Sequence, residues 1–138
     1  MKKTLIGLFT ALFMAAGLQV ATATSAQAVC TSYAGCVDTQ TKASGPKVVA
    51  RKKRATVCGT TTAVGSNVKP SGDLRFSITR NVGKFRFART VPYFGGKMCI
   101  RTKKLKKTGG YTLHVTFLPK DGSLFNSSSG SHGFDVGR

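Results

Sequence analysis

Carboxylate side chains are scarce in this sequence, whose 138 residues include no glutamate and only four aspartates. Tryptophan is absent, and the only histidines are His114 and His132. Acid–base catalysis and metal binding depend mainly on carboxylates and histidines. The sequence also lacks the glycine-rich loops that bind phosphates or dinucleotides. These shortages predict a protein that is not an enzyme and that holds no metal or cofactor.

The first residues have the order of a secretory signal. Lys2 and Lys3 give a charged start, residues 5–20 are almost entirely apolar, and a stretch of small residues ends at Ala28. This order predicts a signal peptide over residues 1–28. The apolar run is shorter than the roughly 20 residues that a membrane-spanning helix needs, so no integral membrane association is expected after cleavage. The protein is therefore expected to be secreted by a bacterium and to be extracellular or associated with the cell wall.

Basic residues are abundant by contrast. Without residues 1–28 the chain has 110 residues (138 − 28), which suits one domain. Its 20 lysines and arginines (22 − 2) face four aspartates, a net charge of +16. Such a field attracts polyanions, so we expect an anionic cell-wall polymer or another polyanion as partner, with nucleic acid as an alternative. No sorting motif or hydrophobic tail precedes Arg138, so any retention at the cell surface is expected to be non-covalent.

Four cysteines lie in the part expected to be exported: Cys30, Cys36, Cys58 and Cys99. An even number in a small secreted domain predicts two disulfides, for which three pairings are possible. The short spacing of the first two favours a local Cys30–Cys36 bridge. No pair of cysteines has the spacing of zinc ligands.

Apolar and polar residues alternate along most of the chain, and no helical period is visible. Residues 29–46 are expected to form a tethered N-terminal loop, and residues 119–133 a loop rich in serine and glycine. The expected strands lie near residues 48–49, 55–63, 73–79, 84–89, 97–102, 111–117 and 134–136. About seven strands without helices predict an all-β fold, an immunoglobulin-like antiparallel β-sandwich over residues 47–138.

Three segments, in order, resemble the bacterial immunoglobulin-like repeat domains of secreted and surface proteins, especially those of actinobacteria. They are the turn and strand entry Lys69–Phe76, the glycine turn and strand Leu105–Phe117, and the serine-rich loop with the closing strand Asp121–Val136. The resemblance covers roughly residues 42–137 and implies a sandwich with a binding or structural role at the cell surface. Family members are typically poor in cysteine, neutral or acidic, and repeated in tandem, whereas this chain is basic and carries cysteines.

Tyr111 begins the expected penultimate strand, two residues before Leu113. An immunoglobulin-like sandwich can place a tyrosine corner there, in which the hydroxyl bonds an upstream backbone group. An ordinary strand tyrosine is the equally acceptable alternative.

Strand alternation also predicts the second disulfide. Cys58 has the opposite parity to Val57, and Cys99 has the opposite parity to Met98 and Ile100. Both cysteines therefore fall on the face away from the core. Because the two strands are neighbours in an immunoglobulin-like sheet, we predict a Cys58–Cys99 bridge across its outer face, worth roughly 2–4 kcal/mol.

Two basic clusters flank this predicted bridge, at residues 51–54 and 101–107. Alternation places four of their side chains on the same outer face, and these are the candidate anion-binding residues: Lys52, Arg54, Arg101 and Lys103. The alternative is a solvated, lysine-rich sheet that merely resists edge-to-edge pairing.

A small secreted basic nuclease or toxin is the alternative from another functional class, with the two histidines as an acid–base pair. His114 is expected to point outward from the middle of a strand, and His132 to lie in the serine-rich loop. Nothing in the sequence brings the two together.

A nucleic-acid-binding surface protein is the other alternative, because basic residues interleave with aromatic ones around Phe85 and Phe87. Rings of this kind can stack on bases. Alternation, however, points both rings into the core. The cations Lys84, Arg86 and Arg89 are expected to face outward.

Overall fold

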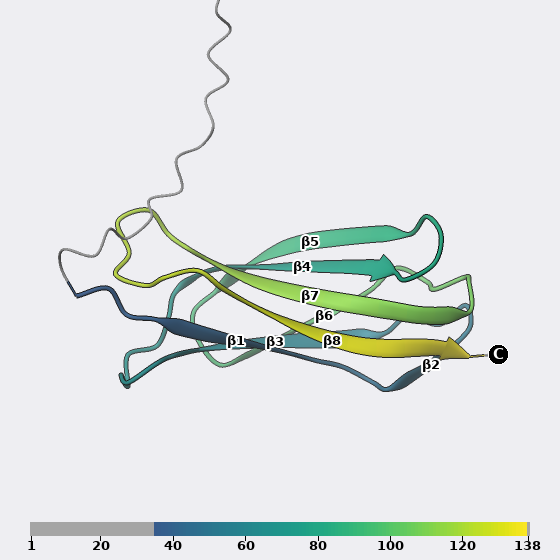
Figure 1. Ribbon diagram of the computed structural model, residues 1–138, viewed down its shortest axis with the longest axis horizontal. Helices are drawn as coiled ribbons and strands as arrows, with labels where there is room; N and C mark the ends of the chain where they lie inside the picture. The colour runs from purple at the N-terminus through teal and green to yellow at the C-terminus, as the bar shows by residue number, and fades with distance from the viewer. Residues whose placement is uncertain (1–34, 138) are drawn as a thin grey trace, which may run out of the picture.

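The computed structural model describes residues 35–137 and contains eight strands and no helix in that range (Figure 1). The strands are β1 (Thr39–Ser44), β2 (Val48–Ala50), β3 (Thr56–Ala63), β4 (Gly72–Arg80), β5 (Arg86–Tyr93), β6 (Lys97–Arg101), β7 (Gly109–Pro119) and β8 (Ser128–Gly137). They form a three-stranded sheet in the order β1-β3-β6 and a five-stranded sheet in the order β2-β8-β7-β4-β5. The predicted all-β class is confirmed.

This strand order is that of an immunoglobulin-like sandwich. β1, β3 and β6 occupy the positions of the A, B and E strands, and β4, β7 and β8 those of C, F and G. All strand pairs are antiparallel except the short β2, which runs parallel to β8. The chain crosses between the sheets through short connections at both ends, so each end of the sandwich presents a group of loops (Figure 1).

Alternate residues of both sheets fill the core. In β4 and β7 the inward positions are apolar, and each inward residue of one strand lies opposite an inward residue of the other. The central residues, all with 0% exposure, are Leu74, Phe76, Ile78, Leu113, Val115 and Phe117. Burying each of them contributes roughly 1.5–3 kcal/mol, so this strand pair contributes a large share of the stability.

The loop expected over residues 29–46 is wrong for residues 39–44, because these form β1. β1 pairs with β3 along its whole length, and Thr41 lies opposite Thr61. Both threonines are buried, and their hydroxyls hydrogen-bond each other at 2.8 Å. Because buried threonines replace aliphatic residues here, the apolar alternation that reveals a strand is missing. The sandwich therefore begins before residue 47.

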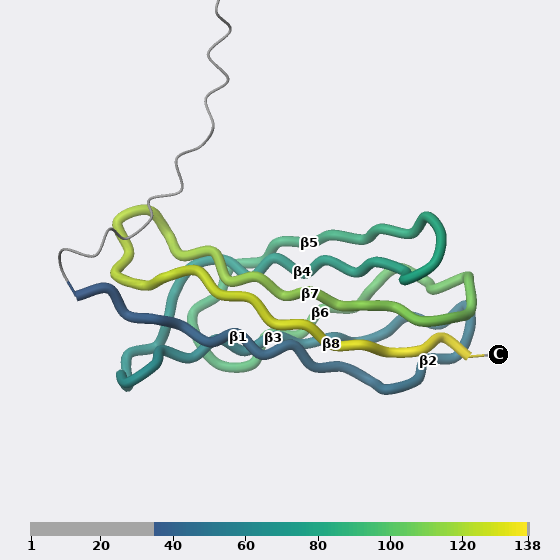
Figure 2. Tube along the Cα trace, in the orientation of Figure 1, coloured from purple at the N-terminus to yellow at the C-terminus, as the bar shows by residue number. Residues whose placement is uncertain are grey.

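The loop expected over residues 119–133 is also too long, because β8 already begins at Ser128. Its first half contains serine and glycine yet pairs fully with β7. The Ser128 hydroxyl bonds those of Thr39 and Thr41 in β1, each at 2.7 Å. At Gly130 the two backbones approach so closely that a Cβ atom would overlap the Thr41 carbonyl oxygen. These residues, with Thr61, form a polar β1–β8 seam that closes one side of the sandwich (Figure 2).

Residues 1–34 and Arg138 lie outside the described part of the chain, and so do the predicted signal peptide and Cys30. Cys36, the predicted partner of Cys30, is disulfide-bonded. The next residue, Val37, is fixed to the β7–β8 loop, because its N–H donates to Leu124 O at 2.7 Å and its carbonyl accepts from Asn126 N at 3.0 Å. The start of the described chain is thus attached to the loops at one end of the sandwich.

Candidate anion-binding surface

Cys58 and Cys99 form the predicted disulfide. They lie directly opposite each other in β3 and β6, with their Cα atoms 4.0 Å apart. The adjacent pair, Val57 and Ile100, is buried in the core, whereas Cys99 is exposed. The bridge therefore joins two neighbouring strands on the outer face of the three-stranded sheet, as predicted.

The four candidate anion-binding residues, Lys52, Arg54, Arg101 and Lys103, are all exposed and lie just beyond this bridge. The β3–β6 pairing continues past the strand ends, because residue 102 N donates to residue 55 O and residue 105 N donates to residue 53 O, both at 2.9 Å. This extended ladder places residues 52–55 beside residues 101–105. The structure thus brings the four cations onto two adjacent segments, while their anion binding remains a prediction.

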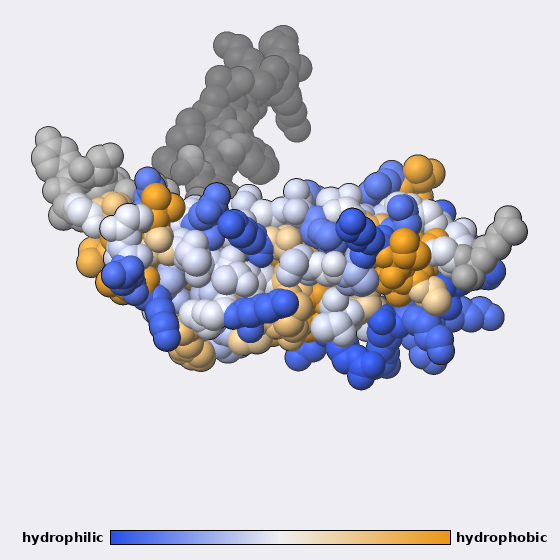
Figure 3. All heavy atoms as spheres, turned by 90° about the horizontal axis from the view of Figure 1, so that it is seen from below, coloured by the Kyte–Doolittle hydropathy of each residue, from blue (hydrophilic) through white to orange (hydrophobic). Residues whose placement is uncertain are grey.

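Five more exposed basic residues lie on the same two segments. Together with the first four they form what we call the cationic end, made of Arg51, Lys52, Lys53, Arg54, Arg101, Lys103, Lys104, Lys106 and Lys107. Hydrophilic side chains crowd this region of the molecule (Figure 3, lower right). Within residues 35–137 no basic side chain forms an ion pair with a carboxylate. The positive charge of this end is therefore uncompensated.

The aspartates are placed away from most of this charge. Asp38 and Asp73 lie where β1 and β4 begin, and Asp121 follows the end of β7, all at the opposite end of the sandwich. Asp135 lies closer, opposite Gly110 on the five-stranded sheet. The nine basic residues of the cationic end therefore lie at one end of the sandwich, and three of the four aspartates lie at the other.

The loop over residues 102–108, which carries four of the lysines, is fixed from inside. Leu105 is fully buried and anchors its middle. Four consecutive carbonyl groups each accept a hydrogen bond: Leu105 O from Lys52 N (2.7 Å), Lys106 O from Arg51 Nε (3.2 Å), Lys107 O from Tyr111 Oη (2.9 Å) and Thr108 O from Arg80 Nη2 (2.7 Å). With these carbonyls held by protein donors, the lysine side chains are left to face solvent. A loop that is ordered before binding loses little entropy on binding.

One of the donors to this loop is the predicted tyrosine corner. The Tyr111 ring is 1% exposed and stacks on Phe134 with ring centroids 5.6 Å apart. Its hydroxyl donates to the carbonyl of Lys107, four residues upstream. The tyrosine corner is confirmed, and it connects the core directly to the cationic end.

Replacing Tyr111 by phenylalanine keeps the ring and removes this single hydrogen bond. We expect the free energy of unfolding to fall by about 1 kcal/mol, the usual net contribution of one hydrogen bond, because this bond is only partly buried. Tyr93→Phe is the comparison, since the buried Tyr93 hydroxyl accepts from the Thr61 N–H at 2.9 Å and donates its one proton to the carbonyl of Gly96 (2.7 Å) or of Thr61 (2.9 Å). Its loss should be nearer 2 kcal/mol. Urea unfolding of both variants checks the ranking, which a smaller loss at Tyr93 would contradict.

The two histidines lie on opposite faces of the five-stranded sheet. His114 of β7 is exposed and lies opposite Ser131, whereas His132 lies opposite the core residue Leu113. The His132 Nε2 atom is 3.4 Å from the Pro46 carbonyl oxygen. The expectation that His132 lies in a loop is wrong, because the serine-rich segment continues β8 by pairing with β7. An acid–base pair needs side chains that converge, so the nuclease alternative gains no support.

The interleaved basic and aromatic residues 84–89, at the start of β5, do not form a stacking surface. Phe85 and Phe87 pack against the core, as alternation predicts. Arg89, expected to point outward, instead shares the inner face with Phe87, because it lies opposite the core residue Phe76. It is nevertheless exposed, since β5 forms the outer edge of the wider sheet (Figure 1). A charge pointing inward at a sheet edge hinders pairing with another chain.

A metal-binding cluster and a membrane-spanning helix are both absent from the described part of the chain. Residues 35–137 contain no cluster of three or more histidine, cysteine, aspartate or glutamate side chains able to hold a metal ion. In the same range, no helix is long and apolar enough to cross a membrane.

No family model matches the sequence, and no curated protein matches it. Among solved structures, the chain is similar to the CARDB domain of the PF1109 protein from Pyrococcus furiosus, which was determined in complex with di-metal ions. The two are 16% identical, the match covers 73% of this chain and 89% of that one, and the TM-score is 0.47. Similarity at this level carries no functional information, so the immunoglobulin-like assignment rests on the strand order of the chain itself.

Proposed function

We propose that the protein is an extracellular immunoglobulin-like module that attaches to anionic polymers through its cationic end. The observation that carries the proposal is the loop over residues 102–108. Its carbonyls are bound by protein donors while its lysines face solvent without carboxylate partners. Such a surface attracts a polyanion over long distances and is already ordered when the polymer arrives.

The predicted signal peptide and the resemblance to bacterial immunoglobulin-like repeat domains support a position at the bacterial cell surface. Anionic wall polymers of the teichoic type are then the proposed ligands, because they carry repeated phosphate groups. We propose binding or structural support as the role and no catalysis.

Binding should depend steeply on salt. If about six phosphates are contacted, affinity for purified teichoic-type polymer should fall by about 300-fold between 50 and 200 mM salt, since counterions are released on binding. Replacing Lys103, Lys104, Lys106 and Lys107 with glutamine should reduce the logarithmic salt slope by about three. Equilibrium binding of the protein to labelled polymer at several salt concentrations measures both effects.

A matched control removes the same charge elsewhere: Lys42, Lys69, Lys97 and Lys120, all exposed and outside the cationic end, replaced with glutamine. This control lowers the net charge equally and should change the slope far less. Equal weakening by the two fourfold variants would show that only total charge matters and would refute the cationic end as a site. Salt-insensitive binding would refute the electrostatic mechanism as well.

A further inference from the structure

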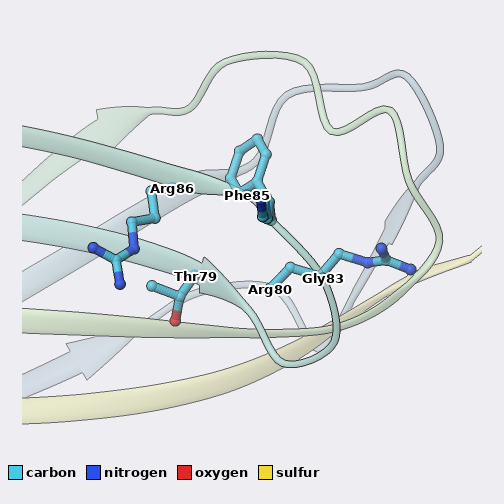
Figure 4. Close-up of a pocket in the computed structure, with 6 residues that line it drawn as sticks. Thr79, Arg80, Gly83, Phe85 and Arg86 are labelled. Atoms are coloured by element: carbon cyan, nitrogen blue, oxygen red, sulfur yellow. The ribbon is translucent and has the colours of Figure 1, made fainter.

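A second cationic feature lies at the turn between β4 and β5. A hollow of about 720 Å³ is lined there by Thr79, Arg80, Gly83, Lys84, Phe85 and Arg86. Lys84 and Arg86 are exposed, Phe85 is half-buried, and no acidic side chain lines the hollow. In Figure 4 the Phe85 ring rises between the side chains of Arg86 and Arg80, which extend in opposite directions.

Arg80 connects this hollow with the loop over residues 102–108. Its Nε and Nη2 atoms both donate to Thr108 O, at 3.2 and 2.7 Å. Its Nη1 atom lies on the side of Gly83, where a Cβ would be 3.1 Å away. Within residues 35–137 this Nη1 donates no hydrogen bond. One part of the guanidinium is therefore used to hold the loop, while another can still bind an anion.

The turn that carries Lys84 is itself fixed. The Arg80 N–H donates to Phe85 O at 3.4 Å, and the Asn81 N–H donates to Gly110 O at 3.0 Å. Gly83 has a φ of 90°, a conformation that glycine adopts readily. The hollow and the loop are thus attached to the same start of β7, so their relative positions are defined.

We propose that the hollow is the second half of one elongated anion site, which begins at the cationic end and passes Arg80. This inference rests on the proposed function and deepens it by naming the ligand class, a linear chain of phosphate groups without bases. A small anion contacts only one half, whereas a chain contacts the loop lysines, the Arg80 Nη1 atom and the pair Lys84 and Arg86. A chain that is bound to one half is held close to the other half, and this high effective concentration raises its affinity above that of a small anion.

The aromatic residues argue against nucleic acid as this chain. Proteins that bind single-stranded nucleic acid do so in part by stacking its bases on exposed aromatic side chains. The Phe85 ring is packed edge-on against Tyr111, with centroids 5.4 Å apart, and belongs to the margin of the core. Among residues 35–137 the exposed aromatic side chain is Phe94, 68% accessible, at the opposite end and beside Lys120. The hollow therefore offers charge and a hydroxyl group but no free platform for a base.

The test compares the secreted protein with its Lys84→Gln/Arg86→Gln variant, using triphosphate and an inorganic polyphosphate of about 25 units as probes. We expect the double substitution to lower the affinity for polyphosphate by about tenfold. It should also remove most of the difference in affinity between polyphosphate and triphosphate. The matched control is Lys42→Gln/Lys97→Gln, a pair of exposed lysines that flank Thr60 on the other sheet. This control should lower long-chain affinity by no more than about twofold.

Equal weakening by the two double variants overturns this inference. The fourfold variant of loop lysines, measured in the same assay, separates it from the proposed function. If the fourfold loop variant binds more weakly than its fourfold control, but the Lys84→Gln/Arg86→Gln variant binds no more weakly than its double control, the cationic end is a site and the hollow is not part of it. If neither does, both proposals fail. Tighter binding of single-stranded DNA than of polyphosphate with equal phosphate number would overturn the base-free ligand class.

Discussion

Replacing both Cys58 and Cys99 with alanine should lower the free energy of unfolding by about 4 kcal/mol. The two cysteines are 41 residues apart in sequence, so their bridge removes a large part of the freedom of the unfolded chain. It also joins the two strands that lead into the cationic end. Urea unfolding of the wild type and the double variant, with comparison of midpoint and slope, measures the difference.

The neighbouring cross-strand pair supplies the control for this prediction. Thr56 and Arg101 lie opposite each other two residues along the same ladder, and they are the next pair on the same outer face. Their replacement with alanine should lower stability by less than about 1 kcal/mol, because an exposed cross-strand pair contributes little. A loss of similar size in both double variants would mean that side-chain packing, and not the covalent link, accounts for the effect.

The sequence predicted those strands whose buried positions are apolar. In β6 and β7 every second residue is aliphatic or aromatic and a pair of glycines marks the start of each strand, so the inner and outer faces follow directly. The Cys58–Cys99 bridge and the Tyr111 corner were predictable for that reason, since both depend on knowing which face a residue occupies. The same rule placed Arg101 and Lys103 outside.

The polar seam could not be predicted in this way. The buried hydroxyl of Thr41 bonds the half-buried hydroxyl of Ser128, so polar side chains occupy positions where an apolar period would otherwise mark the strands. β1 and the first half of β8 therefore resemble loops in the sequence, which is why the sequence predicts a loop position for His132. Arg89 has the parity of Phe87, so alternation alone places it on the inner face, and its charge is the only reason to expect it outside. The inward position is tolerated because β5 is an exposed edge, which the sequence does not show.

The internal support of the candidate site was equally hidden. The Arg51 side chain reaches the carbonyl of Lys106, 55 residues later, and Arg80 reaches Thr108, 28 residues later. Contacts over such distances depend on the assembled sandwich and leave no local pattern. Sequence clustering identified where the charge is, whereas only the structure shows that two of the arginines hold the loop that presents the lysines.

Replacing Gly130 with alanine should lower the free energy of unfolding by about 3 kcal/mol. The new Cβ would overlap the Thr41 carbonyl oxygen and would lie 3.1 Å from the Ala43 nitrogen, and both are backbone atoms that no side-chain rotation can move. β1 and β8 would have to separate, which would lengthen the hydroxyl contacts of Ser128. Thermal and urea unfolding of the single variant measure the loss.

Gly133→Ala in the same strand is the matched control. A Cβ at that position has no atom within 4 Å, and an added methyl group restricts the unfolded chain, so stability should stay unchanged or rise by about 0.5 kcal/mol. Equal losses at Gly130 and Gly133 would mean that the overlap with the Thr41 carbonyl is not the cause of the loss. Hydroxyl bonds of Ser128 to Thr39 and Thr41, together with the close backbone approach at Gly130, hold that side of the sandwich closed. A seam held in this way tolerates no added atom at Gly130.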